Sequence, residues 1–300
     1  MMTPCPSCGA GSPLLFAAKD RNRRISDREF SYHVCPDCSL IFLSPVPEDL
    51  GGYYPTDYYA FPASMRQFES GAEPERYKIE LVQRFAAGGR LLEIGPSNGN
   101  FTLLAKMAGF EVEAIEMDER CCLFLEESLG IQVFCDADPA AALDGADPYQ
   151  VVALWHVIEH IPDPWGTLAA IAEKTRPEGV VVIAAPNPGS LQFRVLGRLW
   201  PHLDAPRHLA LIPRQLLVAH MRRLGFELAW ETTTDRGGIG WNLFGWEFFF
   251  RNTLSFLDFL GPMIVHGISR LLGRAVGGLL GGIERRGCLG SAYTLVFRKE

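Results

Sequence analysis

The sequence has no excess of basic residues: its 28 Lys and Arg stand against 35 Asp and Glu, so the formal net charge is −7. The two signs are interspersed, and no basic stripe of the kind that follows a phosphate backbone is present. The first residues also lack the basic segment and apolar run of a secretory leader. We therefore expect a cytoplasmic protein with no nucleic acid partner.

The sequence also lacks a long uncharged hydrophobic run. Its most apolar segment, 236–288, has helical and largely one-faced spacing, but Arg251, Asp258, Arg270 and Arg274 interrupt it. A membrane span would need about 18 uninterrupted apolar residues. We therefore expect a helical insertion, and three partners for its apolar face stay open. These are a binding site of the same chain, a second copy in a homodimer, and a peripheral membrane or lipid contact through 241–283.

Four of the eight cysteines form two Cys-x-x-Cys pairs, Cys5 with Cys8 and Cys35 with Cys38. In a reducing compartment such pairs indicate metal binding, because two turns can direct four thiolates at one tetrahedral ion. We predict a structural zinc, with a hairpin filling the gap between the pairs. Redox-active pairs are the alternative.

The remaining cysteines are Cys121, Cys122, Cys135 and Cys288, and they lack the spacing of metal ligands. We expect them to be ordinary buried thiols.

Prolines and glycines between 45 and 55 interrupt any regular structure and mark a boundary. We predict a zinc-ribbon-like module at 1–45, a linker at 46–74, and a main domain at 75–300 that contains the insertion. Within the main domain the hydrophobic period alternates between strand and helix. The predicted buried strands lie at 90–94, 111–116, 131–134, 151–154 and 180–184. This alternation is typical of an α/β fold whose parallel sheet is covered by helices on both faces.

The first of these strands ends in Glu93-Ile94-Gly95-Pro96-Ser97-Asn98-Gly99, a tight glycine turn before a helix. Glycines in such a turn let backbone N–H groups approach a ligand. The spacing is not the Gly-x-Gly-x-x-Gly of dinucleotide enzymes, which disfavours a dehydrogenase. Glu116 ends the next strand, where a carboxylate can hold a ribose diol, and Asp136 follows the third strand, where it can accept from an adenine amine.

These residues, together with His156-Val157-Ile158-Glu159-His160-Ile161-Pro162-Asp163-Pro164, resemble class I S-adenosylmethionine (SAM) dependent methyltransferases of the ubiquinone-biosynthesis-like type. The resemblance covers roughly residues 75–235. It implies a Rossmann-like seven-stranded sheet whose last strand is antiparallel, which pairing of 226–233 with 291–298 would supply.

The resemblance also implies that the acid of the first strand and the glycine loop hold the amino-acid part of SAM, that the second acid holds ribose and that the third holds adenine. The implied cofactor residues are Glu93, Gly95, Ser97, Gly99, Glu116 and Asp136. The family's usual middle glycine is Ser97 here, which is small enough to be tolerated. Its usual acid before the fourth strand is Gln150.

Two histidines are candidate catalytic bases, because histidine titrates near neutral pH. His156 follows the fourth strand, and His208 lies in a long loop at 186–211 of the kind that carries binding groups. A structural histidine is the alternative for His156. Arg207 is expected either to pair with an anionic acceptor or to be a solvated loop residue. The tyrosines at 53–59 resemble the lead-in of zinc-ribbon methyltransferases, including some that modify nucleotide-linked sugars.

The sequence thus predicts methyl transfer from SAM to a small-molecule acceptor, such as a sugar, quinone, polyketide or lipid-linked intermediate. The rival from another class is a non-catalytic nucleoside-binding protein with a zinc-ribbon interaction module. The acceptor and the atom methylated are not fixed by the sequence.

Overall fold

A computed structural model describes residues 2–55 and 58–300, and the chain divides into two compact units. The first, which we call the N-terminal unit, comprises Met1–Tyr53, Ala185–Leu217 and Thr232–Thr294. The second, the sheet unit, comprises Tyr54–Ala184, Val218–Glu231 and Leu295–Glu300. Residues 56 and 57 of the predicted linker lie outside the described residues.

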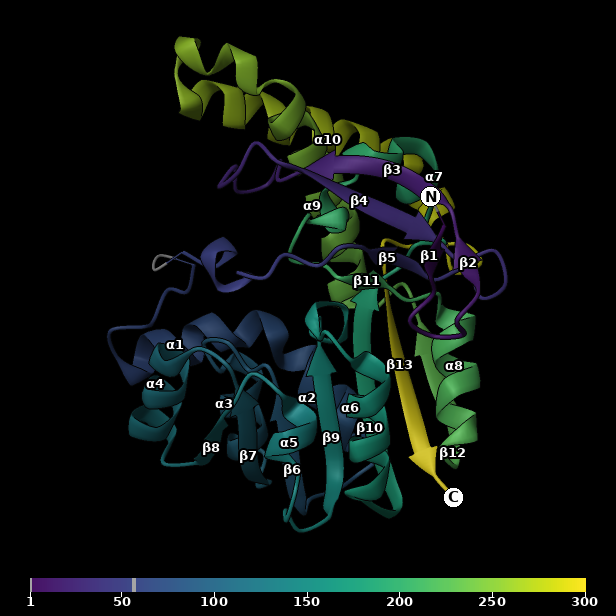
Figure 1. Cartoon of the computed structure of the whole chain (residues 1–300). Helices are drawn as coiled ribbons and strands as arrows, with labels where there is room; N and C mark the ends of the chain where they lie inside the picture. The colour runs from purple at the N-terminus through teal and green to yellow at the C-terminus, as the bar shows by residue number, and fades with distance from the viewer. Residues whose placement is uncertain (1, 56–57) are drawn as a thin grey trace. The chain divides into compact units, whose positions relative to one another are not determined.

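The sheet unit is built on a seven-stranded sheet with the order β12-β13-β10-β9-β6-β7-β8 (Figure 1). Its strands are β6 (Arg90–Ile94), β7 (Glu111–Glu116), β8 (Gln132–Cys135), β9 (Tyr149–Trp155), β10 (Thr175–Pro186), β12 (Phe226–Thr232) and β13 (Ala292–Lys299). Strands β10, β9, β6, β7 and β8 pair in parallel with one another, in that order. Figure 1 shows β13 running opposite to β9, so the sheet is mixed. The predicted α/β fold class is confirmed.

Helix α4 (Glu119–Leu129) shows how capping residues set the ends of a helix in this unit. Asp118 accepts hydrogen bonds from the amides of Arg120 and Cys121 at the start of α4, and Gly130 ends that helix in a left-handed conformation. The helices are α1 (Met65–Ala72), α2 (Arg76–Gln83), α3 (Asn100–Met107), α4 (Glu119–Leu129), α5 (Pro139–Ala142) and α6 (Pro164–Glu173), followed by α8 (Arg214–Arg223), which continues from the N-terminal unit. The helices alternate with the strands of the sheet, as the hydrophobic period of the sequence predicts.

The hydrophobic core of the sheet unit lies between the central strands and the helices α1 to α4. Leu91, Val151, Val180 and Val182 are fully buried on the strands, and Phe101 packs on them from α3. A central strand buried on both faces explains the uninterrupted apolar runs in the sequence. This core fixes the carboxyl ends of β6, β7 and β8 side by side.

The N-terminal unit contains two small antiparallel sheets. One pairs β1 (Thr3–Pro4) with β2 (Gly11–Ser12). The other has the order β11-β5-β4-β3, with β3 (Leu14–Lys19), β4 (Glu29–Val34), β5 (Ile41–Leu43) and β11 (Ala210–Leu211). The hairpin predicted between the cysteine pairs is therefore β3–β4. Because β11 comes from the loop at 186–211, that loop folds with the first residues of the chain.

The insertion forms a helical hairpin in the same unit. Its helices are α9 (Arg236–Thr253) and α10 (Pro262–Glu284), joined by the 3-10 helix η6 (Ser255–Leu260), and Figure 1 shows α9 and α10 packed side by side. Asp235 caps α9 by accepting from the amide of Gly238. The helical insertion predicted at 236–288 is thus present. Helix α7 (Leu191–Leu196) also belongs to this unit.

Candidate cofactor site and metal centre

The glycine turn after β6 adopts the left-handed backbone conformation at three positions. The φ angles are +69° at Gly95, +57° at Ser97 and +79° at Gly99. A Cβ atom added at Gly95 would lie 2.5 Å from Val157 Cγ2, and one at Gly99 would lie 2.2 Å from Leu125 Cδ2. Both positions therefore need glycine for conformation and for space. Ser97 is small, but it adopts the left-handed conformation, which is unfavourable for any residue with a Cβ atom. The demand at this position is therefore on backbone conformation and not on side-chain size.

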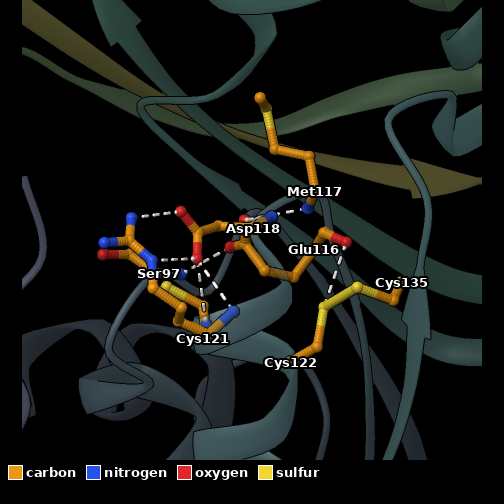
Figure 2. The surroundings of a disulfide bond; sticks show 8 residues. Ser97, Glu116, Met117, Asp118, Cys121, Cys122 and Cys135 are labelled. Atoms are coloured by element: carbon orange, nitrogen blue, oxygen red, sulfur yellow. Dashed lines mark hydrogen bonds and ion pairs between the residues drawn. A yellow bond between two sulfur atoms is a disulfide. The ribbon is translucent and has the colours of Figure 1, made fainter. Parts of the chain in front are cut away.

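Glu116 is buried at the end of β7 and is bound to the glycine turn. Its carboxylate accepts from the amides of Ser97 (3.0 Å), Met117 (2.8 Å) and Asp118 (3.0 Å). Burial raises the pKa of Glu116 above its ordinary value, and these amides act in the opposite direction. Figure 2 shows Glu116 between Ser97 and Met117. The carboxylate predicted to hold ribose thus also fixes the shape of the turn.

Glu93 is buried in the last part of β6 and accepts a hydrogen bond of 2.5 Å from Thr102 Oγ1 of α3. Burial raises its pKa to about 7, although the hydrogen bond from Thr102 and the charge of Lys78 oppose this shift. Lys78 also pairs with Glu75 (2.5 Å) and lies over the Trp155 ring. A titratable acid with a cation close by can hold the ammonium and carboxylate of an amino acid.

Asp136 follows β8, is exposed, and its side chain accepts from the amide of Asp138. Its own amide donates to the carbonyl of Glu116 at 3.0 Å, so the two predicted ligand strands are linked here. Three acids therefore leave adjacent strands of one sheet: Glu93, Glu116 and Asp136.

A disulfide joins Cys122 of α4 to Cys135 at the end of β8, directly before Asp136. Figure 2 shows this bond beside Glu116, whose carbonyl oxygen lies 3.4 Å from the Cys122 sulfur. The expectation that Cys122 and Cys135 are buried thiols is wrong, because α4 packs on β8 and brings the two sulfurs together. Cys121 is a buried thiol as expected, and Cys288 is a half-buried thiol.

The loop after β9 carries His156, which also adopts a left-handed backbone conformation (φ +59°). Its amide donates to the carbonyl of Ala184, and its Nδ1 lies 3.8 Å from a carboxylate oxygen of Glu159. Non-glycine residues in this conformation are uncommon and cluster at functional sites. Val157 fills the space beside Gly95, so this loop and the glycine turn are packed against each other.

Three tyrosines lie near these strand ends in the sheet unit. The Tyr54 hydroxyl lies 3.0 Å from His160 Nδ1, and the rings of Tyr58 and Tyr59 are 4.9 Å apart at their centroids. Burial raises the pKa of Tyr59, and the charge of Glu116 raises it further. The tyrosine segment thus lies close to the acid predicted to bind ribose.

His208 lies in the N-terminal unit and is buried. Its Nδ1 is 2.8 Å from the carbonyl of His202, and burial lowers its pKa to about 4. The hydroxyl of Tyr32 donates to the His208 carbonyl. The neutral ring therefore has its orientation fixed by the backbone.

Arg207 is buried, which corrects the expectation of a solvated loop arginine. It forms two hydrogen bonds of 2.8 Å with Asp204 and one of 2.7 Å with Asp20, both internal partners. These bonds hold the loop at 186–211 against the β3–β4 hairpin. The internal carboxylates therefore take the place of the expected anionic acceptor.

The four predicted zinc ligands lie together in the N-terminal unit. Sulfur–sulfur distances are 3.6 Å for Cys5–Cys38, 3.4 Å for Cys8–Cys35 and 3.9 Å for Cys8–Cys38. A tetrahedral ion with Zn–S bonds of about 2.3 Å requires separations of about 3.8 Å. The donor set and its spacing fit zinc.

The two cysteine turns have the same backbone pattern. Gly9 donates to the carbonyl of Cys5, and Ser39 donates to the carbonyl of Cys35. Both Gly9 (φ +75°) and Ser39 (φ +61°) are left-handed. This duplication is what directs the four sulfurs at one point.

Sequence reasoning missed the polar residues that surround Glu93. Thr102 and Asn100 lie on α3, while Glu75 and Lys78 lie at the start of α2, and Asn100 donates to Glu75 at 2.9 Å. Only the three-dimensional packing of α2 on α3 brings them together. The sequence offers one weak signal, because Asn100 and Thr102 are polar residues in the first turn of the mostly apolar helix α3.

The mostly parallel sheet, the left-handed glycine turn and the acids at successive strand ends are the features of a Rossmann-like methyltransferase domain. The methyltransferase domain family matches residues 69–230, and the chain belongs to that family of SAM-dependent enzymes. Family membership also favours an enzyme over a non-catalytic nucleoside binder.

Two relatives are ubiquinone biosynthesis O-methyltransferases. That of Aromatoleum aromaticum is 30% identical over 178 residues, which cover 54% of this chain and 75% of the relative. That of Bordetella avium is 27% identical over 160 residues, which cover 46% of this chain and 66% of the relative. The N-terminal cysteine pairs precede the residues that the family matches.

A crystal structure of a candidate sarcosine dimethylglycine methyltransferase from Galdieria sulphuraria shares the fold, with a TM-score of 0.51 and 13% identity. The likeness covers 77% of this chain and 86% of that one. It bears on the fold alone.

Proposed function

We propose that this enzyme transfers the methyl group of SAM to a hydroxyl group of a small organic acceptor. The observation that carries the proposal is the meeting of Gly95, Glu116 and Asp136 at the carboxyl ends of three adjacent parallel strands. Ligands of open α/β sheets bind at this edge. The relatives are O-methyltransferases, which supports oxygen as the atom methylated.

The residues present fit SAM in charge and in shape. The glycine turn offers backbone without side-chain bulk, and Ser97 is its left-handed apex. We assign Glu93 with Lys78 to the amino-acid end, Glu116 to the ribose hydroxyls and Asp136 to the adenine amine. When bound, SAM supplies an electrophilic methyl group on a sulfonium, open to direct displacement by an acceptor oxygen.

The chain's own task is then to align the acceptor and to accept its hydroxyl proton. We assign the role of proton acceptor to His156, because the left-handed backbone and the nearby Glu159 carboxylate fix the position of its ring at the end of β9. Glu159 would stabilise the protonated ring. The prediction that His208 acts as a base stays a prediction, tested with the same assay.

The test is a methyl-transfer assay with labelled SAM against a catechol-type quinone precursor, a nucleotide-linked sugar and an amine. We expect transfer to a hydroxyl acceptor, and His156→Asn should lower kcat about a hundredfold with little change in the KM for SAM. His266→Asn, in the exposed part of α10, is the matched control. Transfer to the amine alone would overturn the choice of oxygen, and unchanged kcat in His156→Asn would overturn its role as base.

We also propose that one structural zinc binds Cys5, Cys8, Cys35 and Cys38, supported by their spacing and donor chemistry. A closed four-thiolate site has no open position for a substrate. Its role would be to stabilise a sheet too small to be held by its apolar core alone.

A further inference from the structure

The turn of the helical hairpin presents large apolar side chains to solvent. The exposed fractions are 71% for Phe256, 79% for Phe259, 51% for Leu260 and 88% for Met263. We call these four residues the hairpin tip. Three of them lie in η6, and Met263 lies in the first turn of α10. Contiguous exposure of large apolar residues marks an interaction surface.

Helix α10 packs against α9 partly through small residues, while large apolar residues of the same helix are exposed. Ser269 and Gly273 are buried, and a Cβ atom added at Gly273 would lie 2.6 Å from the backbone of Glu247 in α9. Leu271 (71% exposed) and Leu279 (81% exposed) face away from α9. A helix pair that faces only water buries its large apolar residues, so this arrangement suits an apolar medium outside the pair.

A basic loop lies beside the hairpin in the same unit. Arg21 donates to the carbonyl of Asn252 at the end of α9 (3.5 Å), and the side chains of Asn22 and Asn252 are hydrogen-bonded (3.0 Å). Arg24, two residues further on, reaches to 4.0 Å from Asp258 of η6. The cations of residues 21–24 therefore stand next to the hairpin tip.

The hairpin itself is basic within an acidic chain. Residues 236–288 contain six arginines and three acidic residues, whereas the whole chain has a formal net charge of −7. One of the three acids, Glu284, is buried and accepts from Trp246 and Gln192. The exposed charged groups of this surface therefore carry a net positive charge.

We propose that the hairpin tip docks on a membrane surface rich in anionic phospholipids. The apolar side chains of the tip enter the boundary between headgroups and acyl chains, while the arginines of the basic loop and of α10 bind lipid phosphates. The positive charge of the surface favours an anionic membrane over an uncharged apolar partner. The inference does not rest on the proposed methyl acceptor.

The hairpin lies along the surface and does not cross the membrane. Helix α10 has 23 residues and, by length and composition alone, could span a bilayer. Arg270 and Arg274 occupy its middle, however, and Arg274 pairs with Glu247 of α9 at 3.5 Å. Charges at mid-helix are costly in a bilayer centre but are well placed at a headgroup boundary.

The test is flotation of the full chain with vesicles of phosphatidylcholine alone and of phosphatidylcholine mixed equally with phosphatidylglycerol. We expect binding to the mixed vesicles only, weakened by added salt. The variant Phe256→Ser with Phe259→Ser should lower the affinity about tenfold or more, and so should Arg24→Gln with Arg270→Gln.

Matched controls remove equivalent side chains elsewhere. Met107→Ser with Val195→Ser, and Arg66→Gln with Arg222→Gln, should bind as the parent protein does. The proposal is overturned by absence of binding to the mixed vesicles or by tip variants that bind normally. A concentration-dependent dimer that the tip variants dissociate would assign the surface to a second copy instead. Resistance to alkaline extraction from membranes would replace a surface contact with a span.

Discussion

At the scale of single residues, the buried carboxyl group of Glu93 links the stability of the fold to pH. It is buried, and burial raises its pKa from an ordinary value of 4.5 to about 7. The folded protein holds the proton of Glu93 more tightly than the unfolded chain does. Proton binding therefore makes its full contribution to the free energy of unfolding below pH 4.5. This contribution is lost as the pH rises through about 7.

We therefore expect Glu93→Gln to flatten the pH dependence of the apo protein. Relative to the parent, the variant should gain about 3 kcal/mol in unfolding free energy between pH 4.5 and pH 8, because the amide stays neutral. Denaturant unfolding at several pH values measures the difference. If the parent and variant curves run parallel throughout, Glu93 does not titrate as described.

The Cys122–Cys135 disulfide allows a second residue-scale prediction. It closes a loop with a sequence separation of 13 residues that contains most of α4. Cys122→Ser should lower the unfolding free energy by about 3 kcal/mol, because the open loop gains entropy in the unfolded chain. Denaturant unfolding with and without a dithiol reductant provides the readout. The parent should lose stability on reduction and the variant should not, whereas a parent indifferent to reductant would contradict the role of the bond.

At the scale of elements, the regular part of the fold could be predicted from the sequence. The strands β6 and β7 have the predicted bounds, because buried parallel strands leave uninterrupted apolar runs. The helices of the insertion were also evident from their spacing. What could not be predicted is the grouping of these elements, since it depends on contacts between residues far apart in the sequence.

Two examples show this limit at the candidate site. Arg207 binds Asp20, 187 positions away, so its burial has no local signal. Cys122 and Cys135 meet only because α4 packs on β8. By contrast, the four metal-type cysteines were evident, because each ligand pair has its own local turn and short spacing.

The proposed zinc site gives the prediction at this scale. Cys35→Ser should release the metal and lower the melting temperature, because a three-thiolate site binds zinc more weakly and the small sheet loses its main support. Cys288→Ser, which removes a thiol outside the cluster, is the control. Elemental analysis should give one zinc per parent chain. Full zinc occupancy in Cys35→Ser, or a parent without zinc, would count against the site.

At the scale of the whole molecule, the chain combines a methyltransferase sheet with a unit that has different chemistry. The sheet unit carries the proposed SAM site at the ends of β6, β7 and β8. The N-terminal unit carries the cysteine cluster, the buried Arg207 network and the basic apolar hairpin. We infer that the N-terminal unit serves localisation and support, and that the sheet unit serves catalysis.

The account depends most on SAM binding at the three strand ends, and calorimetric titration of SAM into the parent and Glu116→Ala tests it directly. The parent should bind one SAM per chain. The variant should bind more weakly by about 1–3 kcal/mol, because the ribose hydroxyls lose their acceptor and the turn loses its hold on the Ser97 amide. Circular dichroism of the variant checks that the fold is retained. Equal SAM affinity in a folded Glu116→Ala, or a parent that binds no SAM, would contradict the central claim.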